Sequence, residues 1–263
     1  MTGLIQCLGT WAIGTWEAVT RILAIVGASC ALAARPSSWP LTTRDVFARQ
    51  VYFTAIEAVR SVSIIAVFVG ISVVVQAQVW LTKVGQSALL GPLLVAVVVR
   101  ELGPLLTNFV VIGRSGTAVT AELATMRLNR EDRVLDAQGI DPVVYLVMPR
   151  VLGMMISVLS LTVVFIMVSF VSGYLFGMLI GATDQSPIGF AQTIMRNASL
   201  TDVFNVLAKT LIPGALTGAI CCNEGMSVEG AATEVPQVAG RAVLRSVFAL
   251  FTTSFVISLV SYL

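Results

Sequence analysis

Residues 97–126 read VVVRELGPLLTNFVVIGRSGTAVTAELATM and decide the fold class, because they combine the apolar length of a membrane-spanning helix with charges at Arg100, Glu101 and Arg114. A charged side chain at the centre of a bilayer costs about 2.5–3.5 kcal/mol on insertion scales, so such residues usually face a bundle interior or a water-filled cavity. Arg100 and Glu101 are neighbours and point about 100° apart on a helix, so each needs its own partner. The stretch therefore predicts a membrane protein whose charges serve internal contacts or a pathway.

The composition of the whole chain supports a location in a bilayer. Of the 263 residues, 57% are hydrophobic and 11% are charged, whereas roughly 25% of the residues of an ordinary soluble domain are charged. Mean hydropathy is +0.92. The net charge of +2 and the lack of a Lys/Arg-rich run argue against a nucleic-acid-binding protein.

Two residue types limit the chemistry. The chain has no histidine, which excludes Ser-His and Cys-His nucleophile pairs and the usual catalytic zinc sites. The four cysteines show no C-x-x-C spacing and are expected to act as small apolar residues: Cys7, Cys30, Cys221 and Cys222. We therefore expect no catalytic residue, no metal site and no cofactor in this chain.

Apolar runs with few or no charges predict five membrane-spanning helices, because charges disfavour insertion most strongly. They lie at 61–82, within 91–118, within 151–183, at 203–222 and at 246–263. Residues 4–34 carry Glu17 and Arg21 and an apolar run of only about 13 residues, short of a crossing. We expect an amphipathic helix that lies in the membrane interface, with a sixth crossing as the alternative. The predicted fold is a single all-α integral membrane domain over 1–263, with interfacial and cytoplasmic N-terminal helices in 1–60 and the transmembrane region in 61–263.

The distribution of Lys and Arg predicts the orientation of this domain. If the N-terminus is cytoplasmic, the outer loops hold only Lys83 and Arg196, and the C-terminus is periplasmic. The inner side then holds Arg21, Arg35, Arg44, Arg49, Arg60, Arg127, Arg130, Arg133, Arg150, Arg241 and Arg245.

Residues 122–150 lie between the second and third predicted spans and are expected to contain a short cytoplasmic helix. Asn129 is the predicted N-cap, with Asp132 three residues later, and Gly139 is the predicted helix stop. The helix is either a solvated connector or a coupling helix that docks on a partner. No G-x-x-x-x-G-K-[ST] motif occurs, so any ATP hydrolysis belongs to another chain.

Two rows of small residues at four-residue spacing predict close helix packing. They are Gly113, Thr117 and Ala121 in the second span and Gly173, Gly177 and Gly181 in the third. Pro104 and Pro213 mark possible kinks in the second and fourth spans.

The stretch VVVRELGPLLTNFVVIGRSGTAVTAELATMR, followed by GIDPVVYLVMPRVLG, resembles the MlaE (YrbE-type) permeases of ABC phospholipid transporters. The pattern R-E-L-G-P, G-R-x-G, A-E-L-x-x-M, G-x-D-P and P-R is present in order over residues 100–150. The chain departs from the family in two places. Residues 130–135 read REDRVL where the family commonly has E-Q-I-D-A-L, and Glu234 and Pro236 fit the last inner loop less well.

The resemblance implies a homodimeric permease in the bacterial inner membrane. Its expected partners are two ABC ATPase subunits, which bind ATP and Mg, and an MCE-domain lipid-binding protein on the outer side. Its expected substrate is phospholipid, moved between the inner and outer membranes.

Two sets of residues are the candidates for function. Lys209 lies about 9 Å into the fourth span by the helical rise, so Glu101 and Lys209 could meet at similar depth. The predicted substrate pathway is Arg100, Glu101 and Lys209, although a buried ion pair that only locks helices together is the alternative. The predicted ATPase-coupling residues are Glu122, Met126, Leu135, Gly139, Asp141, Pro142 and Arg150.

Two other functional classes are open from the sequence. The chain could be a channel or secondary transporter that needs no ATPase. An intramembrane enzyme is disfavoured because the chain lacks histidine.

Overall fold

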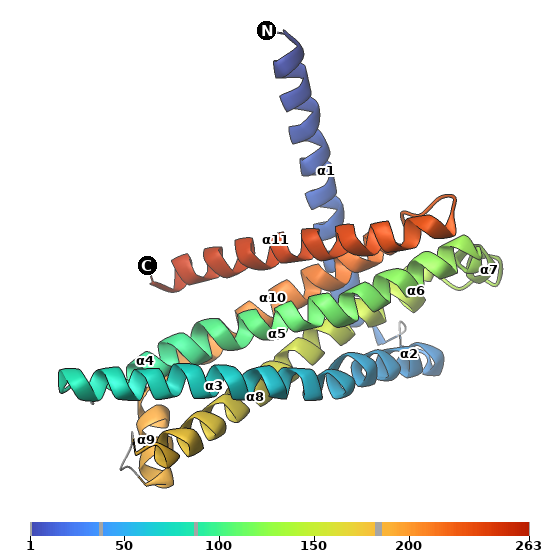
Figure 1. The fold of residues 1–263 in the computed structure, drawn as a ribbon. Helices are drawn as coiled ribbons and strands as arrows, with labels where there is room; N and C mark the ends of the chain where they lie inside the picture. Colours follow the sequence, from blue (N-terminus) through green and yellow to red (C-terminus); the bar gives the residue numbers. More distant parts are fainter. Residues whose placement is uncertain (1, 37–38, 87–88, 182–185, 263) are drawn as a thin grey trace. The chain divides into compact units, whose positions relative to one another are not determined.

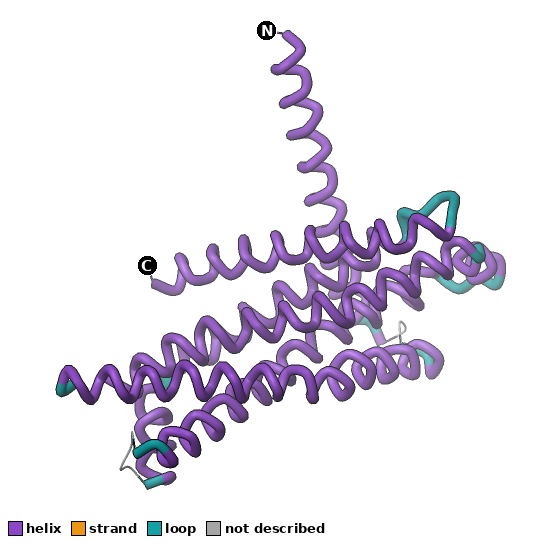
Figure 2. Tube along the Cα trace, in the orientation of Figure 1, coloured by secondary structure: helices purple, strands orange, loops and turns teal. Residues whose placement is uncertain are grey.

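The computed structural model describes residues 2–36, 39–86, 89–181 and 186–262, with side chains described from residue 16 to residue 261 of these ranges. Every regular element within them is a helix (Figures 1 and 2), as predicted. The α-helices are α1 (Thr2–Ala33), α2 (Leu41–Val51), α3 (Glu57–Val84), α4 (Leu90–Leu94), α5 (Gly103–Val111), α6 (Thr117–Leu128), α7 (Glu131–Ala137), α8 (Met148–Leu179), α9 (Pro187–Asn197), α10 (Leu200–Gly225) and α11 (Val235–Tyr262). Four π-helices, η2 (Tyr52–Ile56), η4 (Val95–Leu102), η5 (Ile112–Gly116) and η6 (Val143–Val147), and the 3-10 helix η7 (Ala232–Glu234) complete the described helices.

Six helical stretches among the described residues are long and apolar enough to cross a membrane. They are Trp16–Ala33, Leu41–Val84, Leu90–Leu128, Val143–Leu179, Leu200–Gly225 and Ala232–Ser261. The last five correspond to the five predicted spans, although the third ends at Leu179, before the end of its uncharged run. Residues 182–183 and 263 of the predicted runs lie outside the described residues.

The N-terminal helix is longer than its apolar run indicated. α1 continues without a break from Thr2 to Ala33, and its stretch Trp16–Ala33 qualifies as a candidate span by length and composition. It therefore meets the criterion for the sixth crossing that the sequence left as the alternative, despite Glu17 and Arg21 at its start.

The residues form two compact units, each assembled from three separate stretches of chain. One unit contains residues 1–50, 116–154 and 215–246, and the other contains residues 51–115, 155–214 and 247–263. We call them the first and the second unit. In the first unit, α10 packs closely on α8 and α6, since a Cβ built on Gly218 would lie 2.8 Å from Val151 Cα and one on Gly225 would lie 2.8 Å from Leu123 Cβ.

The second unit is organised around the contact between α3 and α8. A Cβ built on Gly70 would lie 2.2 Å from the carbonyl oxygen of Ser169, and one on Gly173 would lie 2.5 Å from Val74 Cβ. Such close approach of two backbones maximises dispersion contacts, which drive helix association where lipid removes the hydrophobic effect. Two apolar clusters extend from this contact: Ala58, Val62, Ala66, Val111, Val158, Leu161 and Phe165, and Val74, Ala77, Leu90, Leu94, Val98, Tyr174 and Phe190.

The predicted rows of small residues are only partly confirmed. Gly173 and Gly177 pack against α3, as expected. Gly181 is not a packing residue, because it has φ +69° directly after α8 and no described atom lies within 4 Å of its Cβ position. A Cβ built on Gly113 likewise meets no described atom within 4 Å, so this position offers room for a methyl group.

The second span is irregular where its charges lie. η4 carries Arg100 and Glu101, and Pro104 follows in the first turn of α5. Pro213 lies inside α10. π-helical turns and prolines interrupt the regular i→i−4 ladder of backbone hydrogen bonds, which leaves carbonyl groups that need other donors.

We expect Gly70→Ala to destabilise the second unit, because the new methyl group would meet the Ser169 backbone, which cannot move aside as a side chain can. Overpacking of this kind costs about 1–3 kcal/mol. Thermal unfolding of the detergent-solubilised protein measures the effect. Gly113→Ala is the matched control, with unchanged or slightly higher stability expected, and equal losses in both variants would refute the close α3–α8 contact.

Candidate functional site

The predicted contact between the second and fourth spans is present. Lys209 Nζ donates to Glu101 Oε1 at 2.6 Å, and Ser258 Oγ of α11 donates to the same oxygen at 3.0 Å. The Lys209 side chain is only 1% exposed, whereas that of Glu101 is 37% exposed. The lysine is therefore the internal member of the pair, and the carboxylate is the member that reaches a surface.

Arg100 has a different partner, as its direction on the helix required. Its guanidinium pairs with Asp202, whose side chain is 3% exposed. Asp202 Oδ2 also accepts a hydrogen bond from the backbone N–H of Ser199 at 2.7 Å, which anchors the start of α10. Sequence reasoning missed Asp202. The signal was its position seven residues before Lys209, which places both side chains on one face of a helix.

Two prolines explain why backbone oxygens join this polar cluster. Pro104 has no N–H to give to the carbonyl of Arg100, four residues earlier, and Lys209 Nζ donates to that carbonyl at 3.1 Å. Pro213 likewise has no N–H for the carbonyl of Lys209, and Asn108 Nδ2 donates to that oxygen at 3.2 Å. Each proline thus frees a carbonyl that accepts a side-chain donor from the other helix.

The charges of the cluster balance. Two cations and two carboxylates form two ion pairs, so the cluster carries no net charge. Asn205 extends it along the same face of α10, where its Nδ2 donates to Ser261 Oγ at 3.0 Å. An incoming polar group would therefore meet the partly exposed Glu101 and Arg100 first, while Lys209 acts through Glu101.

Arg114, the third charge of the stretch, contacts α3 and the π-turn before it. Its Nη2 donates to Glu57 Oε2 at 2.6 Å, and the guanidinium carbon lies 5.5 Å from the centroid of the Phe53 ring. An ion pair and a cation–π contact together explain how this charge is accommodated.

The predicted coupling segment contains α7. Gly139 stops this helix as expected, with φ +76° and with its N–H donating to the carbonyl of Asp136 at 3.0 Å. The carbonyl of Leu135 accepts from Ile140 N, and Asp141 Oδ1 accepts from Val143 N at 2.8 Å next to Pro142. The predicted N-cap was wrong, because Asn129 ends α6 and the left-handed Arg130, with φ +59°, precedes α7. The loop turns too tightly there for Asn129 to cap the next helix.

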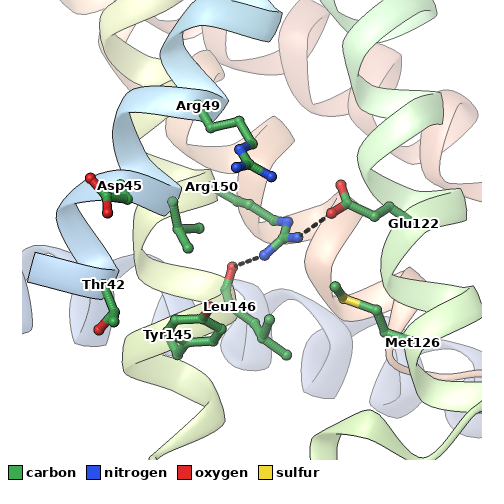
Figure 3. Close-up of a pocket in the computed structure, with 9 residues that line it drawn as sticks. Thr42, Asp45, Arg49, Glu122, Met126, Tyr145, Leu146 and Arg150 are labelled. Carbon is green, nitrogen blue, oxygen red and sulfur yellow. Dashed lines mark hydrogen bonds and ion pairs between the residues drawn. The ribbon is translucent and has the colours of Figure 1, made fainter.

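The remaining coupling residues line one pocket of about 280 Å³ in the first unit, shown in Figure 3. Arg150, whose side chain is 4% exposed, donates to Glu122 Oε1 and to the carbonyl of Leu146, both at 2.8 Å. Met126 lies beside them. α2 supplies the opposite wall through Thr42, Asp45, Val46 and Arg49, and Tyr145 completes the lining.

Sequence reasoning missed the α2 wall, because no local pattern links residues that lie about a hundred positions apart. Glu122, Met126 and Arg150 are thus brought together, whereas Leu135, Gly139, Asp141 and Pro142 shape the connection that contains α7.

Comparisons with known proteins agree with the sequence motifs. Residues 47–260 match the protein family described as Permease MlaE, a range that excludes α1. A probable ABC transporter permease protein of Synechocystis is 32% identical over 199 residues, which cover 74% of this chain and 73% of the relative. TRIGALACTOSYLDIACYLGLYCEROL 1, chloroplastic, of Arabidopsis thaliana is 30% identical over 192 residues, which cover 73% of this chain and 54% of the relative. A probable ABC transporter permease protein of Rickettsia conorii is 26% identical over 253 residues, 96% of this chain and 91% of the relative.

We expect Arg100→Gln to destabilise the protein, because it leaves the buried Asp202 carboxylate without its cation. Removing one member of a buried pair typically costs about 3–5 kcal/mol, and replacing both members costs less. Thermal unfolding of Arg100→Gln, Asp202→Asn and the double variant forms a double-mutant cycle. Strictly additive losses would show that the two side chains do not interact.

A second cycle tests the carbonyl freed by Pro213. Asn108→Ala removes the side-chain donor to the Lys209 carbonyl and should cost about 1–3 kcal/mol, the penalty for an unsatisfied buried acceptor. In a Pro213→Ala background the backbone N–H of the new alanine can satisfy that carbonyl, so the same change should cost less. An equal cost of Asn108→Ala in both backgrounds would contradict this role of Asn108.

Proposed function

The chain belongs to the MlaE permease family, and from that premise we propose that it is the membrane-spanning permease subunit of an ATP-driven phospholipid transporter. The polar cluster of Glu101, Arg100, Lys209 and Asp202 carries this proposal, because it places a partly exposed carboxylate and guanidinium within membrane-spanning helices. Intramembrane charges of this kind mark substrate pathways more often than lipid-facing surfaces. A zwitterionic headgroup offers the complementary pair of charges.

The relatives support a transported lipid and an energy source outside this chain. Two are named as probable ABC transporter permeases, and the name of the Arabidopsis relative contains that of a glycerolipid. In our proposal, ABC ATPase subunits bind ATP and Mg and dock on the segment from Glu122 to Arg150. In this proposal the permease is a homodimer in the bacterial inner membrane, α1 lies in the membrane interface, and the N-terminus is cytoplasmic. An MCE-domain protein exchanges lipid with it on the periplasmic side, and the lipid moves between the inner and outer membranes.

The pocket beside Arg150 gives the coupling proposal a physical basis. The Arg150–Glu122 pair joins α8 to α6, and α7 follows α6 after a two-residue turn. A force applied to α7 would therefore reach two spans through one buried arginine.

Affinity purification from the native membrane in a gentle detergent tests the assembly. We expect an ATPase with a P-loop, an MCE-domain protein and bound phospholipid to co-purify with the chain. If the chain emerges alone even after crosslinking, the coupling proposal fails. Substrate flux through the purified chain without ATP would then identify an ATPase-independent channel or secondary transporter.

We expect Glu101→Gln to lower the rate of lipid transfer per assembled complex about tenfold, because it removes one charge-assisted interaction worth roughly 1.5–3 kcal/mol. The amide keeps the size of the side chain and can still accept hydrogen bonds from Lys209 and Ser258. Transfer of a fluorescent phospholipid by the reconstituted complex measures the rate. Glu229→Gln, an exposed change in the α10–α11 connection, is the control. Normal transfer by a Glu101→Gln complex that assembles poorly would make the pair purely structural.

A further inference from the structure

The end of α10 and the start of α11 hold a charge cluster that the proposed pathway does not use. Glu224 lies one residue before the end of α10, and its side chain is only 4% exposed. Its Oε2 lies 3.5 Å from Arg241 Nε, and its Oε1 accepts a hydrogen bond from Arg245 Nη1. The two arginines are four residues apart and therefore share one face of α11. One buried carboxylate thus holds two guanidinium groups side by side.

The cluster has more positive charge and more N–H donors than the Glu224 carboxylate can pair. One carboxylate against two guanidinium groups leaves a net charge of +1, and about half of each arginine side chain is exposed, 56% for Arg241 and 50% for Arg245. Each guanidinium carries five N–H donors in a rigid fork. Within the described part of the chain, Glu224 is the only ion-pair partner recorded for either arginine. The N–H donors of Arg241 and Arg245 that do not contact Glu224 are available to an anion, and the buried carboxylate fixes the position of both guanidinium groups.

The distribution of charge along α11 places these donors at the level of lipid headgroups. No charged residue follows Arg245 in the chain, and residues 246–262 are helical. Seventeen helical residues rise about 25 Å, close to the roughly 30 Å thickness of the hydrocarbon core. Arg245 and Arg241 therefore lie where an apolar crossing ends, at the depth of the phosphate groups of one leaflet.

The chemistry of the cluster fits a phosphate-binding site better than an ion pair that only holds α10 to α11. A single arginine would neutralise Glu224, so the second adds a cation that the fold does not need for charge balance. Arginine binds phosphate oxygens through two parallel N–H donors, and a guanidinium held in place loses less entropy on binding.

We propose that Arg241 and Arg245, held by Glu224, bind the phosphodiester group of an anionic phospholipid in the leaflet at this end of α11. This lipid is a resident ligand of the permease, separate from the lipid that the pathway moves. The site recognises phosphate and negative charge, and it requires no particular headgroup beyond the phosphodiester.

The full-length chain, purified into mixed micelles with equal amounts of phosphatidylglycerol and phosphatidylcholine, tests the proposal by native mass spectrometry of the retained lipids. The wild type should retain the anionic lipid preferentially. An arginine near an anionic lipid surface contributes a factor of about five in affinity, so Arg241→Gln/Arg245→Gln should lose that preference roughly tenfold or more. Arg241→Lys/Arg245→Lys should keep part of it, because lysine retains the charge but lacks the fork.

The double variant Arg35→Gln/Arg44→Gln is the matched control, since it removes two exposed arginines outside the proposed ATPase-docking segment and should leave lipid retention unchanged. Size-exclusion chromatography and helical content confirm that each variant is folded. Wild-type preference in the Arg241/Arg245 glutamine variant would overturn the proposal. The proposal would also be overturned if inorganic phosphate stabilised the wild-type protein and anionic lipid gave no further stabilisation. That result would indicate a site for free phosphate. Loss of ATPase co-purification with unchanged lipid retention would instead assign the arginines to a protein contact and would also overturn it.

Discussion

A polar group within a bilayer must find its partner inside the protein, because no water is present to replace it. In the second unit, η4–α5 and α10 satisfy each other's charged groups and free backbone carbonyls. Arg100 forms an ion pair with Asp202, and Glu101 forms one with Lys209. The backbone carbonyls freed by Pro104 and Pro213 accept hydrogen bonds from side chains of the opposite helix. The charges and the prolines are parts of one arrangement, since each proline creates an acceptor beside a charged pair.

This arrangement accounts for the functional potential of the site. Fully internal pairs would only hold helices together, and unpaired charges would be too costly in hydrocarbon. Here Lys209 and Asp202 are enclosed, while Glu101 and Arg100 keep an exposed part. The enclosed partners orient the exposed ones, so a headgroup would meet charges whose positions are already set. In the same unit, Gly70 and Gly173 let the backbones of α3 and α8 pack in close contact, which stabilises the unit that holds the cluster.

The first unit uses buried ion pairs at helix junctions. Arg150 joins α8 to Glu122 of α6, and Glu224 joins α10 to two arginines of α11. In both cases one nearly enclosed charge holds a more exposed partner of opposite sign. The enclosed member stabilises the junction, and the exposed member keeps part of its surface outside the pair. In our proposals that surface contacts a protein in the first case and a lipid phosphate in the second.

The sequence alone determined the helical membrane fold, the places of the later spans, the stop of α7 at Gly139 and the meeting of Glu101 with Lys209. These follow from hydropathy, helical rise and the conformational freedom of glycine, which are local or periodic properties of the chain. The three-dimensional structure was needed to show that Asp202 pairs with Arg100, that α2 forms one wall of the Arg150 pocket, and that Gly173 packs closely on α3. It also showed that Asn129 follows α6 as its C-cap and does not cap α7, and that α1 is long enough for a crossing. Such pairings join residues tens to a hundred positions apart, and sequence spacing along one helix carries no information about which face of another helix it will meet.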